Sequence, residues 1–273
     1  MIAEATVVAA PGLVTAIAAV VLAILFAGLW AVSVRIADVS IVDPAWGPAF
    51  VVVALICLIA GNGLAGSGGE GRRWLLFALT AVWGLRLGGY LVARRRASPG
   101  EDRRYTAMRE RHRDGFALYS LGVVFGLQAL LVLVVSLPLQ VAAERRAGLD
   151  PIAWVGVALW AVGLFFEAVG DEQMRRFKAR PDSSGRVMDR GLWRYTRHPN
   201  YFGDFCVWWG LWLVALGAGG TWWTVVGPLV MSYLLIRGSG AALLEKDIAE
   251  RRPQYREYIA RTSAFIPRPP RRR

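Results

Sequence analysis

Long apolar runs alternate with short polar segments along most of the chain. Seven such runs occupy approximately residues 13–34, 44–60, 74–93, 116–138, 152–170, 200–216 and 221–244. A membrane-spanning helix needs about 20 apolar residues to cross a hydrocarbon core roughly 30 Å thick. The pattern therefore predicts an all-α, polytopic membrane protein with seven transmembrane helices. The second run is short and Asp204 interrupts the sixth, so these two depart most from the ideal pattern.

The composition supports this fold class. The 273-residue chain is 55% hydrophobic and 19% charged, with a mean hydropathy of +0.40. These values lie outside the usual range for a soluble domain. The first run is long for a signal peptide and no Lys or Arg precedes it, so we interpret it as a retained helix. No repeat or linker divides the sequence, which we interpret as a single domain over residues 1–273.

The distribution of basic residues predicts the orientation. Most of the 32 Lys and Arg residues fall in segments 94–114, 171–199 and 245–273. Basic residues close to spans stay in the cytoplasm, so we expect the N-terminus outside and the C-terminus inside a plasma membrane. The net charge of +12 lies in short loops rather than on one soluble face, which favours anionic lipid headgroups over nucleic acid as partners. Segment 268–273 is predicted to be a disordered, lipid-facing basic tail.

Several classes of site are not indicated. Cys57 and Cys206 both lie in predicted spans, which suits packing rather than a disulfide framework. His112 and His198 lack the spacing to other ligands that a zinc site needs, so no metal is expected. The sequence contains neither a Walker loop nor a Gly-x-Gly-x-x-Gly turn. Any nucleotide must therefore bind among the helices and their cytoplasmic loops.

A dense polar motif precedes the sixth run. Between Gly191 and Asp204 the chain places several hydrogen-bonding or charged side chains against an apolar, tryptophan-rich stretch: Arg194, Tyr195, Arg197, His198 and Asn200. Such residues at the mouth of a membrane helix are costly to bury without partners, and a bound anion is one explanation. An interfacial belt of snorkelling side chains is the alternative.

The fifth run ends in a polar helix face. Glu167, Asp171 and Arg175 are four residues apart, so their side chains share one face. Two carboxylates and a guanidinium can hold ribose hydroxyls and a phosphate, although an ordinary ion pair would give the same spacing. Eight cations lie on this face and after it: Arg175, Arg176, Lys178, Arg180, Arg186, Arg190, Arg194 and Arg197. They suit a dinucleotide phosphate, and equally the excess of positive charge on the cytoplasmic side.

The first half of the chain offers a second set of polar candidates. Asp43 opens the second run, followed by Pro44 and Trp46, and a helix N-cap is the alternative role for its carboxylate. Trp83, Arg86 and Tyr90 share a face of the third predicted helix. A phenol near a cation or carboxyl group can polarise a carbonyl, while packing in the helix bundle is the alternative.

These residues carry a resemblance to a known family. Segments 166–173, 191–204 and 255–267, supported by Val42–Gly47 and Arg86–Tyr90, resemble the bacterial DUF1295 group of the steroid 5α-reductase family over most of the chain. That family implies a seven-helix membrane reductase which binds NADPH from the cytoplasmic side. It also implies reduction of a carbon–carbon double bond conjugated to a carbonyl in a lipid. Residues 13–140 would then form the substrate side and residues 151–267 the cofactor side.

The resemblance assigns roles by position. Asp171, Arg186, Asn200 and Asp204 would frame NADPH, and Glu167 stands where the steroid enzymes have an amide. The remaining expected cofactor residues are Arg175, Arg194, Tyr195, Arg197, His198, Tyr201 and Glu245. Asp43 would replace the family's substrate-side glutamate.

One departure affects the chemistry. Trp83 occupies the position of the steroid enzymes' tyrosine, and an indole cannot donate a phenolic proton. Either Tyr90 takes that role, or the substrate is not a 3-keto steroid. We therefore expect Asp43 and Tyr90 to be catalytic, with Trp46, Trp83 and Arg86 lining the substrate.

Two other functions stay open. Arg197-His-Pro-x-Tyr201 and a C-terminal Glu245 resemble the isoprenylcysteine and phospholipid methyltransferases, which bind S-adenosylmethionine. Those enzymes carry two adjacent glutamates, whereas this chain has Glu245-Lys246. A lipid binder that has lost its chemistry is the third possibility. In each case the ligand is a hydrophobic small molecule, and no obligate protein partner is expected.

Overall fold

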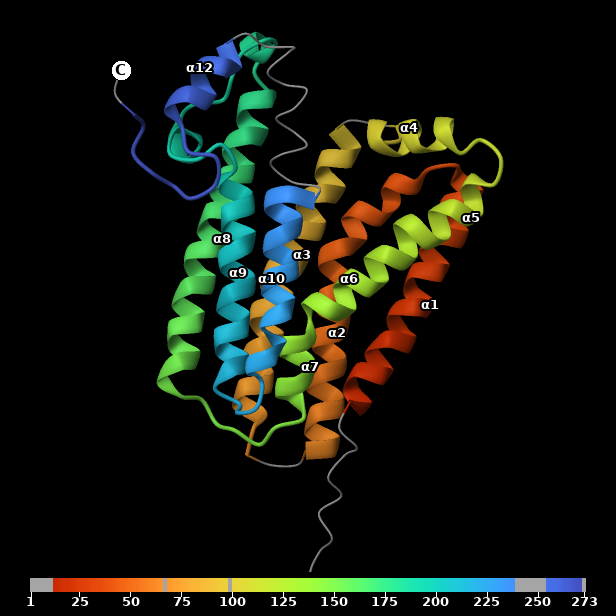
Figure 1. Ribbon diagram of the computed structural model, residues 1–273, viewed down its shortest axis with the longest axis vertical. Helices are drawn as coiled ribbons and strands as arrows, with labels where there is room; N and C mark the ends of the chain where they lie inside the picture. The colour runs from red at the N-terminus through yellow and green to blue at the C-terminus, as the bar shows by residue number, and fades with distance from the viewer. Residues whose placement is uncertain (1–11, 66–67, 98–99, 239–253, 272–273) are drawn as a thin grey trace, which may run out of the picture. The chain divides into compact units, whose positions relative to one another are not determined.

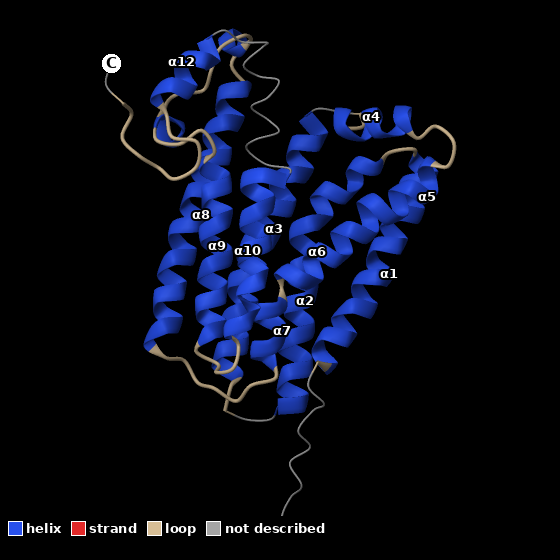
Figure 2. Cartoon of the chain, in the orientation of Figure 1, coloured by secondary structure: helices blue, strands red, loops and turns tan. Residues whose placement is uncertain are grey.

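The computed structural model describes residues 12–65, 68–97, 100–238 and 254–271. Over these residues the chain is built from helices and loops, and the lone β-bridge joins Thr196 to Ser263 (Figure 2). Five helical stretches are long and apolar enough to cross a membrane: Leu13–Ile36, Val39–Gly63, Glu70–Ala97, Phe116–Val135 and Pro151–Lys178. They confirm the all-α membrane class and the first five predicted spans. The other two predicted spans correspond to shorter helices, so the count of seven and the orientation stay predictions.

The chain forms two compact units, which are described separately. Unit 1 comprises residues 1–153 and 214–227, and unit 2 comprises residues 154–213 and 228–273. The interpretation as a single domain with a substrate side and a cofactor side stays a prediction.

Unit 1 contains the first four spans. Its elements are α1 (Leu13–Ile36), η1 (Val39–Ile41), α2 (Val42–Ala65), α3 (Glu70–Ala97), α4 (Arg103–Arg111), α5 (Phe116–Ser120), the π-helical turn η2 (Leu121–Gly126), α6 (Leu127–Val135), α7 (Leu137–Ala143) and η5 (Trp222–Val225). Within this unit α1 packs against α2 and α6, and α2 packs along α3 (Figure 1). The fourth span stops at Val135 because Pro138, in the first turn of α7, begins a new helix.

Glycines bring α2 and α3 into close contact. A methyl group at Gly84 would lie 2.6 Å from the carbonyl oxygen of Gly47, and one at Gly88 would lie 2.8 Å from Cδ of Pro48. Small residues at such positions let two membrane helices approach backbone to backbone. Alongside, Trp83 is fully buried and its ring packs edge-on to Phe50, with centroids 5.6 Å apart. The pair of helices thus forms a tight frame for Asp43, in the first turn of α2.

A buried arginine near the start of α3 stabilises the end of the α2–α3 pair that lies away from Asp43. Arg72 is 1% exposed and pairs with Asp150 at 3.1 Å, while its guanidinium also donates to the carbonyls of Gly148 and Val214. Asp150 in turn accepts from the backbone N–H of Ala153 at 2.8 Å, in the first turn of the fifth span. The sequence pattern predicts a Gly-rich loop over residues 61–73 and a span from residue 74, but α3 begins at Glu70, so this arginine is part of the helix.

Unit 2 carries the polar motifs of the second half. Its elements are α8 (Pro151–Lys178), η3 (Pro181–Ser183), η4 (Gly191–Arg194), α9 (Pro199–Leu216), α10 (Val226–Tyr233), the π-helical turn η6 (Leu234–Gly238) and α12 (Gln254–Arg261). Helices α8 and α9 lie side by side within this unit (Figure 1). Trp209 of α9 donates to Ser232 of α10 at 3.1 Å.

A glycine seam joins α8 to α9. Methyl groups would lie 2.6 Å from the Val207 nitrogen if placed at Gly163, 2.5 Å from the Glu167 nitrogen at Gly203, and 2.7 Å from the Trp160 nitrogen at Gly210. Because no other residue allows such an approach, the seam fixes which polar residues of the two helices face each other.

The C-terminal segment is fastened to the motif before α9. The hydroxyl of Thr196 donates to the Phe265 carbonyl at 2.7 Å, and the Arg268 N–H donates to the Tyr195 carbonyl at 3.0 Å. The Tyr258 hydroxyl donates to the Trp193 carbonyl. The prediction of a disordered tail from residue 268 is therefore wrong as far as Arg271, whose N–H donates to the Arg261 carbonyl. Composition indicated disorder, but these tertiary hydrogen bonds order the backbone.

Candidate functional site

Unit 2 gathers acidic side chains on the α8–α9 seam. Glu167, Asp171 and Asp204 are 2%, 4% and 9% exposed. Nδ2 of Asn200 donates to Oδ1 of Asp171 at 3.2 Å. The seam explains this grouping, since Gly203 lies against the backbone of Glu167 and Gly170 packs on Pro199. The structure thus brings four of the predicted cofactor residues onto one helix pair, where buried carboxylates need hydrogen-bond or ionic partners.

Arg197 and His198 have partners within the fold. Nη1 of Arg197 donates to the carbonyls of Thr262 at 2.7 Å and Ile259 at 3.3 Å, and the residue is 8% exposed. The imidazole of His198 stacks on Tyr201 with ring centroids 5.5 Å apart. Cofactor binding by these two residues stays a prediction, whereas the contacts show that Arg197 holds the C-terminal segment.

The other predicted cofactor residues lie further out. Arg175 makes two hydrogen bonds to Glu172, at 2.6 and 2.8 Å, an ion pair with a neighbour three residues before it that the sequence analysis did not single out. Arg194 and Tyr195 are exposed. Glu245 lies outside the described residues, so its predicted role stays untested.

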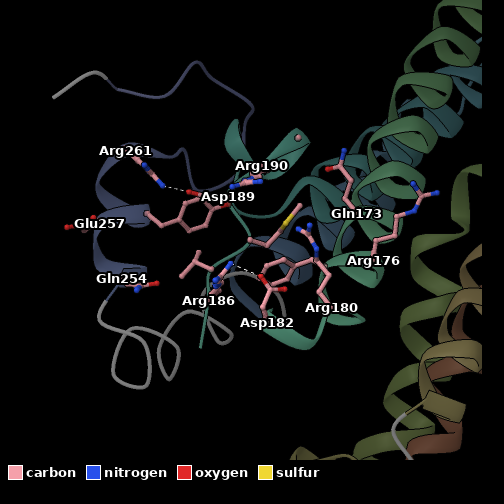
Figure 3. A pocket seen from close by; sticks show the side chains of 15 residues that line it. Gln173, Arg176, Arg180, Asp182, Arg186, Asp189, Arg190, Gln254, Glu257 and Arg261 are labelled. Atoms are coloured by element: carbon pink, nitrogen blue, oxygen red, sulfur yellow. Dashed lines mark hydrogen bonds and ion pairs between the residues drawn. The ribbon is translucent and has the colours of Figure 1, made fainter. Parts of the chain in front are cut away.

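A large hollow on unit 2 is rich in arginine (Figure 3). This arginine pocket has a volume of about 890 Å³. Its lining residues are Gln173, Arg176, Phe177, Arg180, Asp182, Arg186, Val187, Met188, Asp189, Arg190, Gly191, Gln254, Glu257, Tyr258 and Arg261. The volume falls within the range of small-molecule and cofactor sites, roughly 300 to 1,000 Å³.

Local turn chemistry shapes one wall of the arginine pocket. Gly191 adopts a φ of +61°, and any side chain there would collide with Gln173. Without that side chain, Oε1 of Gln173 accepts from the Leu192 N–H at 3.0 Å and ties the loop to α8. The backbone conformation therefore explains why the 191–204 motif begins with glycine.

Cations outnumber acids in the arginine pocket. Five arginines face three carboxylates, and two pairs are already formed, Arg186 with Asp182 at 2.7 Å and Arg261 with Asp189. Arg180 and Arg190 form no ion pair with another described residue. Of the eight cations that the sequence analysis associates with phosphate binding, four line the pocket: Arg176, Arg180, Arg186 and Arg190. Sequence reasoning missed Arg261, whose position at the end of the amphipathic helix α12 was a usable signal.

Unit 1 contains a carboxylate–phenol pair. Oδ1 of Asp43 accepts from the hydroxyl of Tyr105 at 2.7 Å, and Oδ2 accepts from Arg104 at 2.8 Å. Asp43 is not a helix N-cap, because it follows the first residue of α2, and Asp38 instead caps the preceding turn η1. Burial, and then the negative charge of Asp43, raises the pKa of Tyr105 well above its usual range. The phenol therefore stays protonated at neutral pH.

Helix α4 presents this phenol. Asp102 is its N-cap and accepts from the Arg104 N–H at 2.9 Å, while its own N–H donates to the Ser40 hydroxyl at 2.7 Å. Burial opposes ionisation of Asp102, but its hydrogen bonds with Arg104 hold the pKa below the usual range. Sequence reasoning treated segment 94–114 as a basic loop and missed Tyr105. A usable signal was the Asp102 cap before a short helical stretch.

A second hollow, the Asp43 pocket, lies beside this pair. It has a volume of about 530 Å³ and is lined by Ser40, Asp43, Pro44, Leu91, Arg94, Arg95, Gly100, Glu101, Asp102 and Arg103. Of the predicted substrate residues, Trp46 packs edge-on to Phe50 with centroids 5.1 Å apart and Trp83 is in the core. Arg86 and Tyr90 are half-buried on α3. The phenol that donates to Asp43 is Tyr105, so catalysis by Tyr90 stays a prediction.

No metal centre is evident where the chain is described, since no group of three or more His, Cys, Asp or Glu side chains there could hold an ion.

Comparison with known proteins identifies relatives but not an activity. The family model for DUF1295, described as a protein of unknown function, matches residues 29–262. The chain is 27% identical over 271 residues to the uncharacterized protein C594.04c of Schizosaccharomyces pombe, covering 88% of this chain and 76% of that protein. No solved structure matches. Because the family model spans most of the sequence, including both candidate pockets, the chain belongs to the DUF1295 family.

Proposed function

We propose that this protein is an NADPH-dependent membrane reductase acting on a carbon–carbon double bond conjugated to a carbonyl in a lipid. Three features support the proposal. Apolar spans give access to lipid substrates, unit 2 offers an arginine-rich hollow of dinucleotide size, and unit 1 offers a carboxylate paired with a protonated phenol. The resemblance of the sequence motifs to the steroid 5α-reductase family points in the same direction.

The lining of the arginine pocket favours NADPH over S-adenosylmethionine as the cofactor. NADPH has a pyrophosphate and a further phosphate on its ribose, all anionic, whereas S-adenosylmethionine has a cationic sulfonium and no phosphate. Guanidinium groups bind phosphates by paired, charge-assisted hydrogen bonds. A lining of five arginines against three acids, with Arg180 and Arg190 outside any ion pair among the described residues, suits the polyanion and disfavours the sulfonium.

The remaining roles follow from the residues at each site. NADPH supplies a hydride, and the chain has to bind it, orient it and manage a proton. Arg180, Arg186 and Arg190 would hold its phosphates, and the Asp171–Asn200 pair would receive ribose or amide groups. Tyr105 keeps its proton at the Asp43 carboxylate, which lines a hollow of its own. That proton is available to the substrate oxygen when hydride adds to the alkene.

Equilibrium binding to the detergent-purified protein tests the cofactor assignment. NADPH should bind saturably and more tightly than NADH, and S-adenosylmethionine should not bind. The double variant Arg180→Gln/Arg190→Gln should weaken NADPH binding on the order of tenfold or more, since it removes two charged donors. Arg256→Gln is the matched control, because Arg256 is an exposed arginine of α12 that does not line the pocket.

The outcomes separate the three functional classes. Binding of S-adenosylmethionine without NADPH would replace the proposal with a methyltransferase. Binding of neither would favour a lipid binder without chemistry. Once NADPH binding is established, loss of NADPH absorbance in the presence of conjugated enone lipids measures the reaction itself.

A further inference from the structure

Around the Asp43 pocket the carboxylates all have ionic partners, whereas some of the arginines have none among the described residues. Its three carboxylates already have cationic partners. Arg104 pairs with Asp43 at 2.8 Å and with Asp102 at 3.0 Å, and Arg109 pairs with Glu101 at 2.8 Å. Neither of these two arginines lines the pocket. These two arginines neutralise two of the three negative charges, and the arginines of the lining, Arg94, Arg95 and Arg103, outweigh the one that remains.

The arginines on the same wall retain unused donors. Arg94 and Arg103 are exposed, and neither forms an ion pair with another described residue. Nη2 of Arg95 binds Asp38, but its Nη1 is buried and has no hydrogen-bond partner among the described residues. A buried guanidinium N–H without an acceptor is costly, and an anion in the pocket would satisfy it.

The position of the pocket indicates the kind of anion. Arg94 and Arg95 lie in the last turn of α3, and Asp43 lies in the first turn of α2. Both helices have the length and hydropathy of membrane spans, so their ends fall at the depth of lipid headgroups. Pro44 and Leu91 add apolar surface to the lining, next to the exposed Val92 on α3. An amphiphile can thus place its charged head among the arginines and its chain along the helices.

We propose that the Asp43 pocket binds the anionic, phosphate-type headgroup of an amphiphilic lipid, and that this lipid is the substrate. The arginines recognise the headgroup, while the adjoining carbonyl lies beside the Tyr105 phenol that donates to Asp43. The identification of this lipid as the substrate rests on the proposed reductase function. The binding site itself does not, because it is built from residues of unit 1 alone.

Binding of dodecyl phosphate tests the site. Radiolabelled dodecyl phosphate should bind saturably to maltoside-solubilised protein immobilised on beads, and dodecanol should not compete with it. The double variant Arg94→Gln/Arg103→Gln should lower the affinity on the order of tenfold or more. The control Arg96→Gln/Arg111→Gln has the same change in charge at two exposed arginines outside the pocket, and its affinity should stay within about twofold of the wild type.

Three results would overturn the proposal. They are absence of saturable binding, equal loss of affinity in both double variants, and competition by inorganic phosphate as strong as by unlabelled dodecyl phosphate, which would indicate a soluble anion. NADPH binding is measured on the same preparations. If dodecyl phosphate binds as expected and NADPH does not, the proposed lipid site is supported and the proposed reductase function is overturned. The reverse result removes the lipid site alone.

Discussion

The hydroxyl of Tyr105 in α4 donates a hydrogen bond of 2.7 Å to Oδ1 of Asp43 in α2, across 62 positions of sequence. Arg104 occupies the other carboxylate oxygen of Asp43. The phenol and the guanidinium thus each contact one oxygen of the same carboxylate. Trp83 has no phenol to donate, so under the proposed function Tyr105 is the group that supplies the proton.

Removing this phenol should slow turnover without affecting the cofactor. In Tyr105→Phe we expect kcat for enone reduction to fall by about 10²- to 10⁴-fold, the usual contribution of a positioned acid or base. NADPH affinity should be unchanged, because the arginine pocket belongs to the other unit. Tyr119→Phe is the control, since Tyr119 stacks on His112 rather than contacting Asp43. Full activity in Tyr105→Phe, together with loss of activity in Tyr90→Phe, would show that Tyr90 is the proton donor.

The same phenol predicts a response to alkaline pH. Burial and the Asp43 carboxylate raise the pKa of Tyr105 in the folded protein above the value of about 10 that a phenol has in the unfolded chain. Above that pH the unfolded chain releases the proton while the folded protein keeps it, so stability falls as the pH rises. Below it, the phenol is protonated in both states and the contribution does not vary. The melting temperature of the wild type should therefore decline more steeply above about pH 10 than that of Tyr105→Phe. Parallel curves would show that the phenol is not shielded, and Tyr233→Phe, at an exposed site, should behave like the wild type.

The glycine seam predicts a strong effect of a small substitution. In Gly163→Ala the added methyl group would lie 2.6 Å from the Val207 nitrogen, so α8 and α9 must separate. Overpacking of this kind costs about 1 to 3 kcal/mol. Gly89→Ala is the control, because a methyl group at this helical position meets nothing within 4 Å. We expect a lower unfolding temperature in detergent, and weaker NADPH binding through displacement of Asp171 from Asn200, for Gly163→Ala alone. Equal unfolding temperatures of Gly163→Ala and Gly89→Ala would mean that α8 and α9 are less closely packed at Gly163 than described.

The sequence predicted the elements better than the contacts between them. Apolar runs locate membrane helices because each run is a local property, and the i to i+4 spacing of Glu167 and Asp171 placed both on one buried face. The resemblance of motifs assigned Asp171 and Asn200 to the same cofactor site, but nothing in the sequence indicated the hydrogen bond between them. In contrast, the predicted third span begins at residue 74, so Arg72 was assigned to the Gly-rich loop before it.

That assignment failed for a physical reason. Arg72 is buried because Asp150 and the carbonyls of three residues far along the chain surround it: Ala147, Gly148 and Val214. Partners 75 to 142 residues away leave no periodic signal around the arginine itself. Tyr105 was missed for the same reason, since its partner Asp43 belongs to another helix.

Arg197 was expected from the sequence to bind the cofactor, but in the fold it anchors the C-terminal segment. Its Nη1 donates to the carbonyls of Thr262 and Ile259, so Arg197→Gln should loosen the C-terminal segment. Amide hydrogen exchange in residues 258–268 should become faster even without cofactor, because hydrogen bonds that depend on this anchor open more often. Arg194→Gln, at an exposed position of the same motif, should leave that exchange unchanged. If Arg197 instead served only to bind phosphate, the variant would exchange like the wild type in the absence of NADPH and differ from it only when NADPH is added.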